Sequence, residues 1–550
     1  MEGIILKYAL QNAVKYGGKA NSGAVISHIL ADNPGLKSKI KDIAKEVNSI
    51  ISGVNRLSLE MQRQKLQDLA PELLKEKQKE KTDLRELPNA KQGEVVTRMP
   101  PEPSKYIHIG HALSFLINYM YAQKYNGKCI LRFEDANPEK VSMEYVDAMK
   151  EDVLNYLEIK PDKIVFVSDH MDIFYKYATD LIKMNKAFIC FCEQEKMQDL
   201  RHKSIECKCR KKNVEINLKE WGRMLKGRYK EGGCSLRIKG DMKSQNHVMR
   251  DSVIFRIVSK QHYRKKKKYK VWPMYDFYNS IEDSTLGITH ILRSNEFMLR
   301  GELQNYIKDL LNLKKQTVIE YGRFNVIGAV TQGREIRALI ESGKYTGWDD
   351  PRLVTLRALR RRGILKGTYY ELAKEVGLSA SPTNIDFKLI AKINKRFLDK
   401  RANRYFFVSG ERKIKINGMP KIKNVEIPLH PDFPERGKIR LRVADEFYVD
   451  DDIKEGKAYR LLHLFNFKDN QFISKEHDPK LNAALIHWLP VSKKLVNVKI
   501  VMDDGTVKNG FGERSLKKLK VGDQIQFIRF GFVRLDKKEK NKLVFWFTHN

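Results

Sequence analysis

The chain has 550 residues, with 104 lysines and arginines against 68 aspartates and glutamates, and a formal net charge of +36. This length exceeds what one hydrophobic core can fill, so several domains are expected, and the charge favours a polyanionic partner, either nucleic acid or an anionic membrane surface. Neither a long apolar run nor a signal-peptide pattern is present, so we expect no membrane span and a cytoplasmic protein.

The first 90 residues have helical patterning. Leu66, Leu69 and Leu73 recur at helical spacing, and the charged segment KEKQKEKTDLRELP predicts a helix that ends at Pro88. We therefore predict a helical N-terminal extension over residues 1–90, which is either a partner-binding appendage or a solvated linker.

The pattern changes after residue 90. GEVVTRM is strand-like, PPEPSKY is a loop, GHALSFLINYMYAQKY is an amphipathic helix, and KCILRFED is a second strand. This order predicts a β-α-β unit at the start of a doubly wound, Rossmann-like parallel sheet over residues 91–330. Such sheets bind ligands at the carboxyl ends of their strands, beside helix N-termini, which is where His108 and His111 are expected.

Two further regions follow. DDPRLVTLRALRRRGIL favours a helix and predicts a helical connector over residues 331–384. Residues 385–550 contain short β-rich runs such as RYFFV, KIRLRV and YRLLHLF between turns, which predicts an all-β region of barrels or sandwiches. The run RKKKKYK at 264–270 is either a solvated loop or a loop that contacts phosphates.

Four of the six cysteines form two C-x-C pairs within residues 190–209. Four thiolates at this spacing predict one structural Zn²⁺, which would hold together an insertion at about residues 185–250. The alternative is four reduced cysteines packed as small hydrophobic residues. The predicted ligands are Cys190, Cys192, Cys207 and Cys209.

The segment VVTRMPPEPSKYIHIGHA resembles the class I glutamyl-tRNA synthetases, which carry a near-identical strand, proline loop and HIGH motif. LRFEDANPEK, YDFYNSIEDSTLGITHILRSNEF, GWDDPRLVTLRALRRRGI, ANRYFFV, PLHPDFPERG and VGDQIQFIRFGFVRLD resemble further blocks of this family in the same order. The β-rich tail is similar to the archaeal and eukaryotic branch, which reads the anticodon with β-barrels. The resemblance implies a multidomain glutamate–tRNA ligase with ATP, Mg²⁺, L-glutamate and tRNA(Glu) as partners, and we expect a monomer.

The resemblance also assigns the nucleotide site. Activation of glutamate places negative charge on the α-phosphate and on the departing pyrophosphate, so the protein must mainly position groups and stabilise charge. His108 and His111, at a helix N-terminus, can donate hydrogen bonds to those oxygens. Pro101 and Gly110 join them at the nucleotide, and Gly110 leaves room for its close approach.

The resemblance places Arg98, Glu134, Tyr275 and Arg293 around the amino acid. Glu134 is expected to hold the ammonium group, Tyr275 to donate its hydroxyl, and Arg293 to bind the γ-carboxylate. A buried arginine that faced the neutral amide of glutamine would lose its charge partner, so a glutamine–tRNA ligase is disfavoured. The residues expected to contact tRNA are Arg357, Arg360 and Arg361.

One motif departs from the family. The mobile loop that carries lysines in relatives aligns here with VTQGREIR, so Gly333 and Glu335 stand where lysines are expected. Arg334 is then the predicted catalytic cation, and Lys105 replaces a usual glycine in the proline loop. This departure leaves open a non-catalytic tRNA-binding paralogue, and the sequence does not decide whether tRNA(Gln) is also charged.

Overall fold

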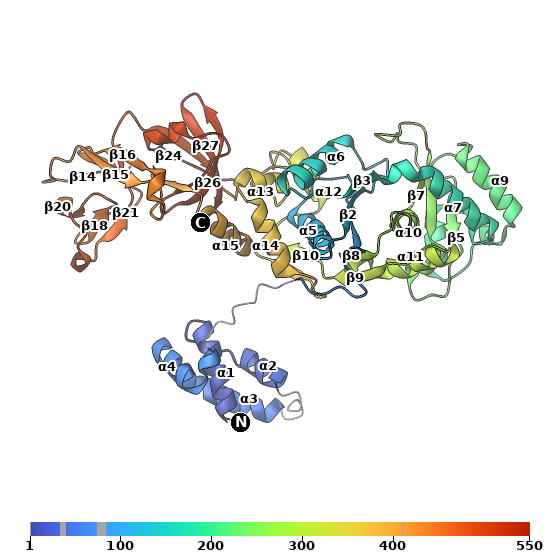
Figure 1. The fold of residues 1–550 in the computed structure, drawn as a ribbon, viewed down its shortest axis with the longest axis horizontal. Coiled ribbons are helices and arrows are strands. Elements are labelled where there is room, and N and C mark those ends of the chain that lie inside the picture. Colours follow the sequence, from blue (N-terminus) through green and yellow to red (C-terminus); the bar gives the residue numbers. More distant parts are fainter. Residues whose placement is uncertain (1, 33–39, 74–83, 411) are drawn as a thin grey trace. The chain divides into compact units, whose positions relative to one another are not determined.

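The computed structural model describes residues 2–32, 40–73, 84–410 and 412–550, and the chain divides into two units, Met1–Asp83 and Leu84–Asn550 (Figure 1). The first unit is helical, as predicted, with α1 packed against the three helices that follow. Its helices are α1 (Glu2–Lys15), α2 (Ser22–Asp32), α3 (Ile40–Val54) and α4 (Leu59–Leu69).

The first unit has its own core. Ile5, Ala9, Val47 and Leu66 are fully buried, whereas Leu69 lies on the exposed side of α4. Ser58 caps α4 by accepting a hydrogen bond from the Met61 N–H, which satisfies one of the free donors at the helix start. The helical pattern of the sequence therefore identified the elements of this unit, although not every member of its buried face.

The helix predicted for the charged segment that ends at Pro88 is not found in the described residues. Its residues 75–83 lie outside the described part of the chain, and residues 84–88 are not helical, so the prediction is wrong there. Leu87 is instead buried in the core of the second unit, and its N–H donates to the Tyr125 hydroxyl at 2.7 Å. Pro88 disfavours helical geometry in the residue before it, which supports the extended path.

The second unit begins with the predicted parallel sheet. β1 (Val96–Met99), β2 (Lys128–Phe133) and β3 (Lys163–Phe166) pair in that order, and α5 (Ile109–Lys124) connects β1 to β2 and packs on β1. β8 (His290–Ser294) and β9 (Thr317–Tyr321) form a second parallel pair.

β8 lies beside β1 on the side away from β2, where the Thr289 N–H donates to the Val96 carbonyl at 3.0 Å. The chain thus builds outward from β1 in one direction and later returns to its other side. The carboxyl end of β1 is therefore the point at which the strand order reverses, and open sheets bind ligands at such points.

An antiparallel sheet interrupts this arrangement, in the order β4-β5-β6-β7. It extends to residue 273, so the insertion is longer than the predicted 185–250. The helices and strands of this region are α7 (Met171–Lys183), β4 (Ala187–Cys190), α8 (Gln194–His202), α9 (Val214–Leu225), β5 (Ser235–Ile238), β6 (Val253–Ile257) and β7 (Val271–Pro273). The helices α10 (Tyr275–Thr285) and α11 (Met298–Leu310) come after it in the chain.

The connector is helical, as predicted, but it continues past residue 384. α12 (Gly333–Glu341), α13 (Leu356–Arg362) and α14 (Lys366–Val376) are followed by α15 (Phe387–Leu398). The prediction that residue 385 begins an all-β region is therefore wrong for α15. Ile390, Ile393 and Leu398 of FKLIAKINKRFL are buried along one face, and Asp386 caps the helix.

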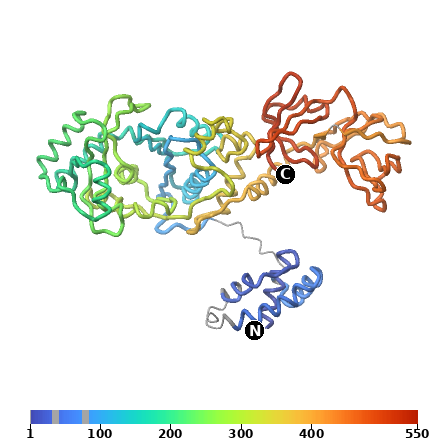
Figure 2. Tube along the Cα trace, turned by 180° about the vertical axis from the view of Figure 1, so that it is seen from behind, coloured from blue at the N-terminus to red at the C-terminus, as the bar shows by residue number. Residues whose placement is uncertain are grey.

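The chain after α15 is rich in strands, as predicted (Figure 1). It is the orange-to-red part of the trace in Figure 2. Its largest sheet has seven strands in the order β12-β25-β26-β27-β23-β24-β13, and smaller sheets are formed by the remaining strands. The bounds of the large sheet are β12 (Asn403–Tyr405), β13 (Phe407–Val408), β23 (Val496–Val501), β24 (Val507–Gly512), β25 (Gln524–Phe527), β26 (Gly531–Glu539) and β27 (Lys542–His549). Among the described helices, none has the length and apolar character needed to span a membrane.

Arg361 joins α13 to the large sheet. Its Nε and Nη2 donate to the two carboxylate oxygens of Asp536 on β26 at 2.8 and 2.7 Å, and its Nη1 donates to Asp349 at 2.8 Å. The guanidinium also lies 4.0 Å from the ring centre of Trp546. Residue 361, predicted to contact tRNA, is thus engaged with carboxylates of the protein itself.

We expect Arg361→Ala and Asp536→Ala each to lower the free energy of unfolding by about 1–3 kcal/mol. Each change leaves a partly buried charge without its bidentate partner. The two effects should not add in the double variant, since both remove the same interaction. Thermal unfolding measures this, with Arg442→Ala, an exposed arginine, as control. Additive losses would contradict the pairing.

Candidate active site

A cavity of about 560 Å³ lies at the carboxyl ends of β1, β2 and β8 and at the N-terminus of α5. This is the reversal point of the strand order, where the sequence placed the ligand. Apart from the predicted cation Arg334, the residues predicted to contact the nucleotide or the amino acid line this cavity: Arg98, Pro101, His108, Gly110, His111, Glu134, Tyr275 and Arg293.

The two histidines begin α5 by capping it. The His108 Nδ1 accepts a hydrogen bond from the Gly110 N–H at 3.1 Å, and the His111 Nδ1 accepts one from the His108 N–H at 3.3 Å. Because each Nδ1 is an acceptor, each neutral ring carries its proton on Nε2. Both imidazoles can therefore donate one N–H bond to a ligand.

Burial keeps both rings neutral. It lowers the pKa of His108 to about 3, with the charges of Lys105 and Arg323 adding to the effect, and it lowers the pKa of His111 well below its ordinary value. At neutral pH the pair thus supplies hydrogen bonds and the helix dipole, but no net positive charge.

The glycine at position 110 leaves room for the capping ring of His108. A Cβ at position 110 would lie 3.0 Å from Cε1 and 3.2 Å from Nδ1 of His108, closer than side-chain atoms normally approach. The sequence predicted a glycine that makes room for the nucleotide. The structure gives an additional reason, because the His108 ring itself folds back over this position.

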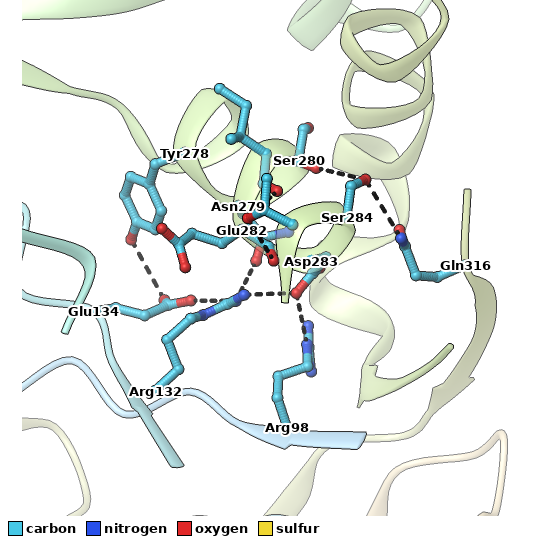
Figure 3. Close-up of polar contacts among 12 residues, drawn as sticks. Arg98, Arg132, Glu134, Tyr278, Asn279, Ser280, Glu282, Asp283, Ser284 and Gln316 are labelled. Atoms are coloured by element: carbon cyan, nitrogen blue, oxygen red, sulfur yellow. Dashed lines mark hydrogen bonds and ion pairs between the residues drawn. The ribbon is translucent and has the colours of Figure 1, made fainter. Parts of the chain in front are cut away.

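A buried ion cluster includes two of the residues that line the cavity, Arg98 and Glu134 (Figure 3). Asp283 of α10 accepts from Arg98 Nε at 3.2 Å and from Arg132 Nη1 at 2.6 Å. Arg132 Nη2 donates to Glu134 at 2.9 Å and to Asn279 at 2.7 Å. The cluster joins β1, β2 and α10, and it fixes two cavity residues, Arg98 and Glu134, from behind.

Arg132 and Asp283 were missed by the sequence analysis. A charged residue between the buried Leu131 and Phe133 of the strand KCILRF is an available signal, because buried parallel strands are normally apolar throughout. Residues 276, 279, 280, 282 and 283 make α10 a buried polar helix, which is a second signal of a charged partner.

Glu134 has an unusual environment for a carboxylate. Burial raises its pKa to about 7, against the charges of Arg132 and Arg98 that lower it. The Tyr278 hydroxyl donates to its second oxygen at 3.4 Å. Near neutral pH, this carboxylate is thus close to the point at which it changes charge.

Arg293 lines the cavity with partners already in place. Its Nε and Nη2 donate to Glu320 at 3.1 and 3.0 Å, and its Nη1 donates to Gln304 at 2.7 Å. A guanidinium has five N–H groups, so two remain for a ligand. The predicted contact with a γ-carboxylate would use these two groups.

The structure does not bring Arg334 to the cavity. It is exposed on the first turn of α12, as is Glu335, and neither is among the lining residues. Lys105 and Arg323 line the wall instead. Arg323 was missed by the sequence analysis, because nothing in the pattern YGRFNV marks it.

The remaining basic residues predicted to contact tRNA or phosphates differ in whether they are paired with acidic residues. Arg357 is exposed and lies 4.9 Å from the ring centre of Tyr106, and Arg360 pairs with Glu151 at 2.6 Å. In the RKKKKYK run, the first two cations, Arg264 and Lys265, pair with Asp169.

The four predicted cysteine ligands converge. The Sγ atoms of Cys190, Cys192, Cys207 and Cys209 all lie within 4.8 Å of one another, and those of Cys190 and Cys207 are 3.9 Å apart. The buried Arg237 points its Nη1 at these two sulfurs, at 3.5 and 3.4 Å.

The chain is similar to known proteins over its whole length. A family model described as "tRNA synthetases class I (E and Q), catalytic domain" matches residues 94–400, and two models of the anticodon-binding domain of this family match residues 402–486 and 485–536. The chain is 41% identical to the glutamate--tRNA ligase of Pyrococcus abyssi (strain GE5 / Orsay) over 571 aligned residues, and 40% identical to that of Methanocaldococcus jannaschii over 560, with 100% of each chain covered. The chain therefore belongs to the class I tRNA synthetases for glutamate and glutamine.

Proposed function

We propose that the protein is a glutamate–tRNA ligase, which activates glutamate with ATP to glutamyl-adenylate and transfers the glutamyl group to the terminal adenosine of tRNA(Glu). The observation that carries this is the pair of neutral imidazoles at the start of α5, which face the same cavity as Arg98, Glu134 and Arg293. Full-length identity to glutamate--tRNA ligases supports it. We expect a cytoplasmic monomer.

In the first step, the α-carboxylate of glutamate attacks the α-phosphorus of ATP, and the bond to pyrophosphate breaks. The Nε2–H groups of His108 and His111 donate to the phosphate oxygens as charge builds there, and the N-terminus of α5 adds its dipole. Mg²⁺ enters with the nucleotide as part of the substrate and neutralises phosphate charge.

The amino acid is held by groups of opposite charge. Glu134 faces the ammonium group, Tyr275 donates its hydroxyl, and the two free N–H groups of Arg293 bind the γ-carboxylate. Arg98, fixed by Asp283, is available for the α-carboxylate. The ion pair of Arg293 with Glu320 holds the guanidinium in place before the substrate arrives.

The tRNA is bound mostly through its phosphates, which suits the net charge of +36. Arg357 and Arg360 remain as proposed contacts because they are exposed or paired only at the surface. For Arg361 we propose that positioning of the strand-rich region replaces direct contact. That region takes the anticodon, as its match to anticodon-binding domains suggests.

The reaction is tested by exchange of labelled pyrophosphate into ATP, with tRNA present and with glutamate or glutamine as substrate. Exchange with glutamate and not with glutamine is expected. Tight tRNA binding without exchange would favour the non-catalytic paralogue, and exchange with glutamine would favour the glutamine–tRNA ligase. Charging assays with tRNA(Glu) and tRNA(Gln) then decide which tRNAs are substrates.

Arg293→Gln should raise the KM for glutamate by at least tenfold and leave the KM for ATP within about twofold. The change removes a charged contact to the γ-carboxylate, worth more than about 1.4 kcal/mol, and touches nothing on the nucleotide. Initial rates of exchange at varied glutamate and ATP measure both constants. An equal rise in both would show that Arg293 supports the cavity as a whole.

The kcat/KM for glutamate should fall as the pH drops from 8 to 6. Glu134 has a raised pKa of about 7, so below this pH it gains a proton and loses its attraction for the ammonium group. The loss approaches about tenfold for each pH unit below the pKa. In Glu134→Gln, kcat/KM should be low and nearly independent of pH over this range; an unchanged pH profile would assign the titration to another group.

We also propose that the cysteine cluster holds one structural Zn²⁺. Sulfurs at about 2.3 Å around a tetrahedral zinc lie roughly 3.8 Å apart, close to the 3.9 Å between Cys190 and Cys207. Four thiolates and Zn²⁺ carry a net charge of −2, and the buried guanidinium of Arg237 beside the sulfurs offsets part of it. The metal would join β4 to the segment after α8.

Protein purified without chelators should contain close to one zinc per chain by elemental analysis. Cys207→Ser with Cys209→Ser should lose it, because two of the four ligands are removed. Cys234→Ala is the matched control: this cysteine is also buried, but it lies outside the cluster, and its variant should keep the metal. If wild-type protein purified in this way contains no metal, and added zinc does not change its thermal stability, the packed-cysteine alternative is supported.

A further inference from the structure

Of the cations that line the cavity, Lys105 has no ion-pair partner among the described residues. Arg98 is bound by Asp283, Arg293 by Glu320, and Arg323 by Glu296. The acids that face Lys105 are Glu102, which accepts from the Ser104 hydroxyl, and Glu296, which holds Arg323.

Lys105 is also packed against the start of α12. A Cβ at Gly333, the first residue of this helix, would lie 3.0 Å from Cδ and 3.3 Å from Cβ of Lys105. Gly333 is buried under the lysine stem. A side chain at position 333 would therefore meet the stem of Lys105, and here the long side chain comes from the proline loop.

The ammonium group of Lys105 supplies positive charge beside the two neutral histidines. His108 and His111 are neutral, so they cannot balance the charge of a triphosphate, whereas a cation close to them can. Lys105 lies near enough to both rings for its charge to lower the pKa of each. Arg323 and Arg337 in turn act on Lys105, and burial is the main cause of its lowered pKa.

We propose that Lys105 is the catalytic cation for the β- and γ-phosphates of ATP, supplied by the proline loop in place of a side chain from the first turn of α12. As the bond between the α-phosphorus and pyrophosphate breaks, the ammonium stabilises the charge that moves onto the departing oxygen. This assignment rests on the proposed ligase function, and it gives the role expected of Arg334 to another residue.

The decisive variants change charge and packing separately. Lys105→Met keeps an unbranched stem over Gly333 and removes only the ammonium, so kcat for exchange should fall about 10²-fold with the glutamate KM within about twofold. Lys105→Arg should retain most of the activity. Lys344→Ala, an exposed lysine just after α12, is the matched control and should behave as wild type.

A side-chain exchange tests the contact between positions 105 and 333. Gly333→Lys alone should lower activity, because two long side chains then compete for one site. Lys105→Gly combined with Gly333→Lys should recover at least tenfold over Lys105→Met, because one lysine again fills the space from the other side. A double variant as inactive as Lys105→Met, together with normal thermal unfolding, would overturn the proposal.

Two further results separate the possible failures. If Lys105→Met stays within threefold of wild type while Arg334→Ala loses tenfold or more, the cation belongs to α12 and the proposal is wrong. If wild-type protein shows no exchange, the ligase function fails, but ATP binding still tests the cation: Lys105→Met should weaken ATP affinity about tenfold in calorimetry. Equal ATP affinity in the two proteins would overturn the assignment.

Discussion

The buried carboxylate of Asp283 is the constraint on which the cavity depends. Two buried guanidinium groups, those of Arg98 and Arg132, converge on one of its oxygens. Such charges are tolerated inside a protein only when they are paired, and removing one partner of a buried pair costs about 3–5 kcal/mol. Because the three residues come from β1, β2 and α10, the same interaction ties α10 to the two strands whose ends form the cavity.

The sequence predicts those parts of the fold that depend on local pattern. The β-α-β unit follows from alternating apolar runs and a helical stripe, and each is visible within about twenty residues. The errors have a tertiary cause. Residues 84–88 continue a charged helical pattern, yet Leu87 is buried in the same core as α5. α15 has helical periodicity but begins a region otherwise dominated by strand-forming residues, so its type was hidden by its neighbours.

The candidate site shows the same division. His108 and His111 were predictable because a short motif and a helix start coincide. Asp283 was not, because its partner Arg132 lies 151 positions away along the chain. Arg361 shows the reverse error: a helix rich in arginine suggests a surface for phosphates, but the sequence cannot say that Asp536 faces it. The partner of a charged residue is decided by tertiary packing, and the local sequence does not indicate it.

The capping of α5 has a consequence for how the site responds to acid. The same Nδ1 atom of His108 that would take up a proton holds the first turn of the helix. Its pKa is lowered to about 3 in the folded chain and is near 6.5 when unfolded, so between these values the unfolded state binds a proton that the folded state does not. Acidification through this range therefore lowers the free energy of unfolding while the ring stays neutral in the folded chain. Protonation of either Nδ1 would remove the hydrogen bond by which that ring caps the start of α5.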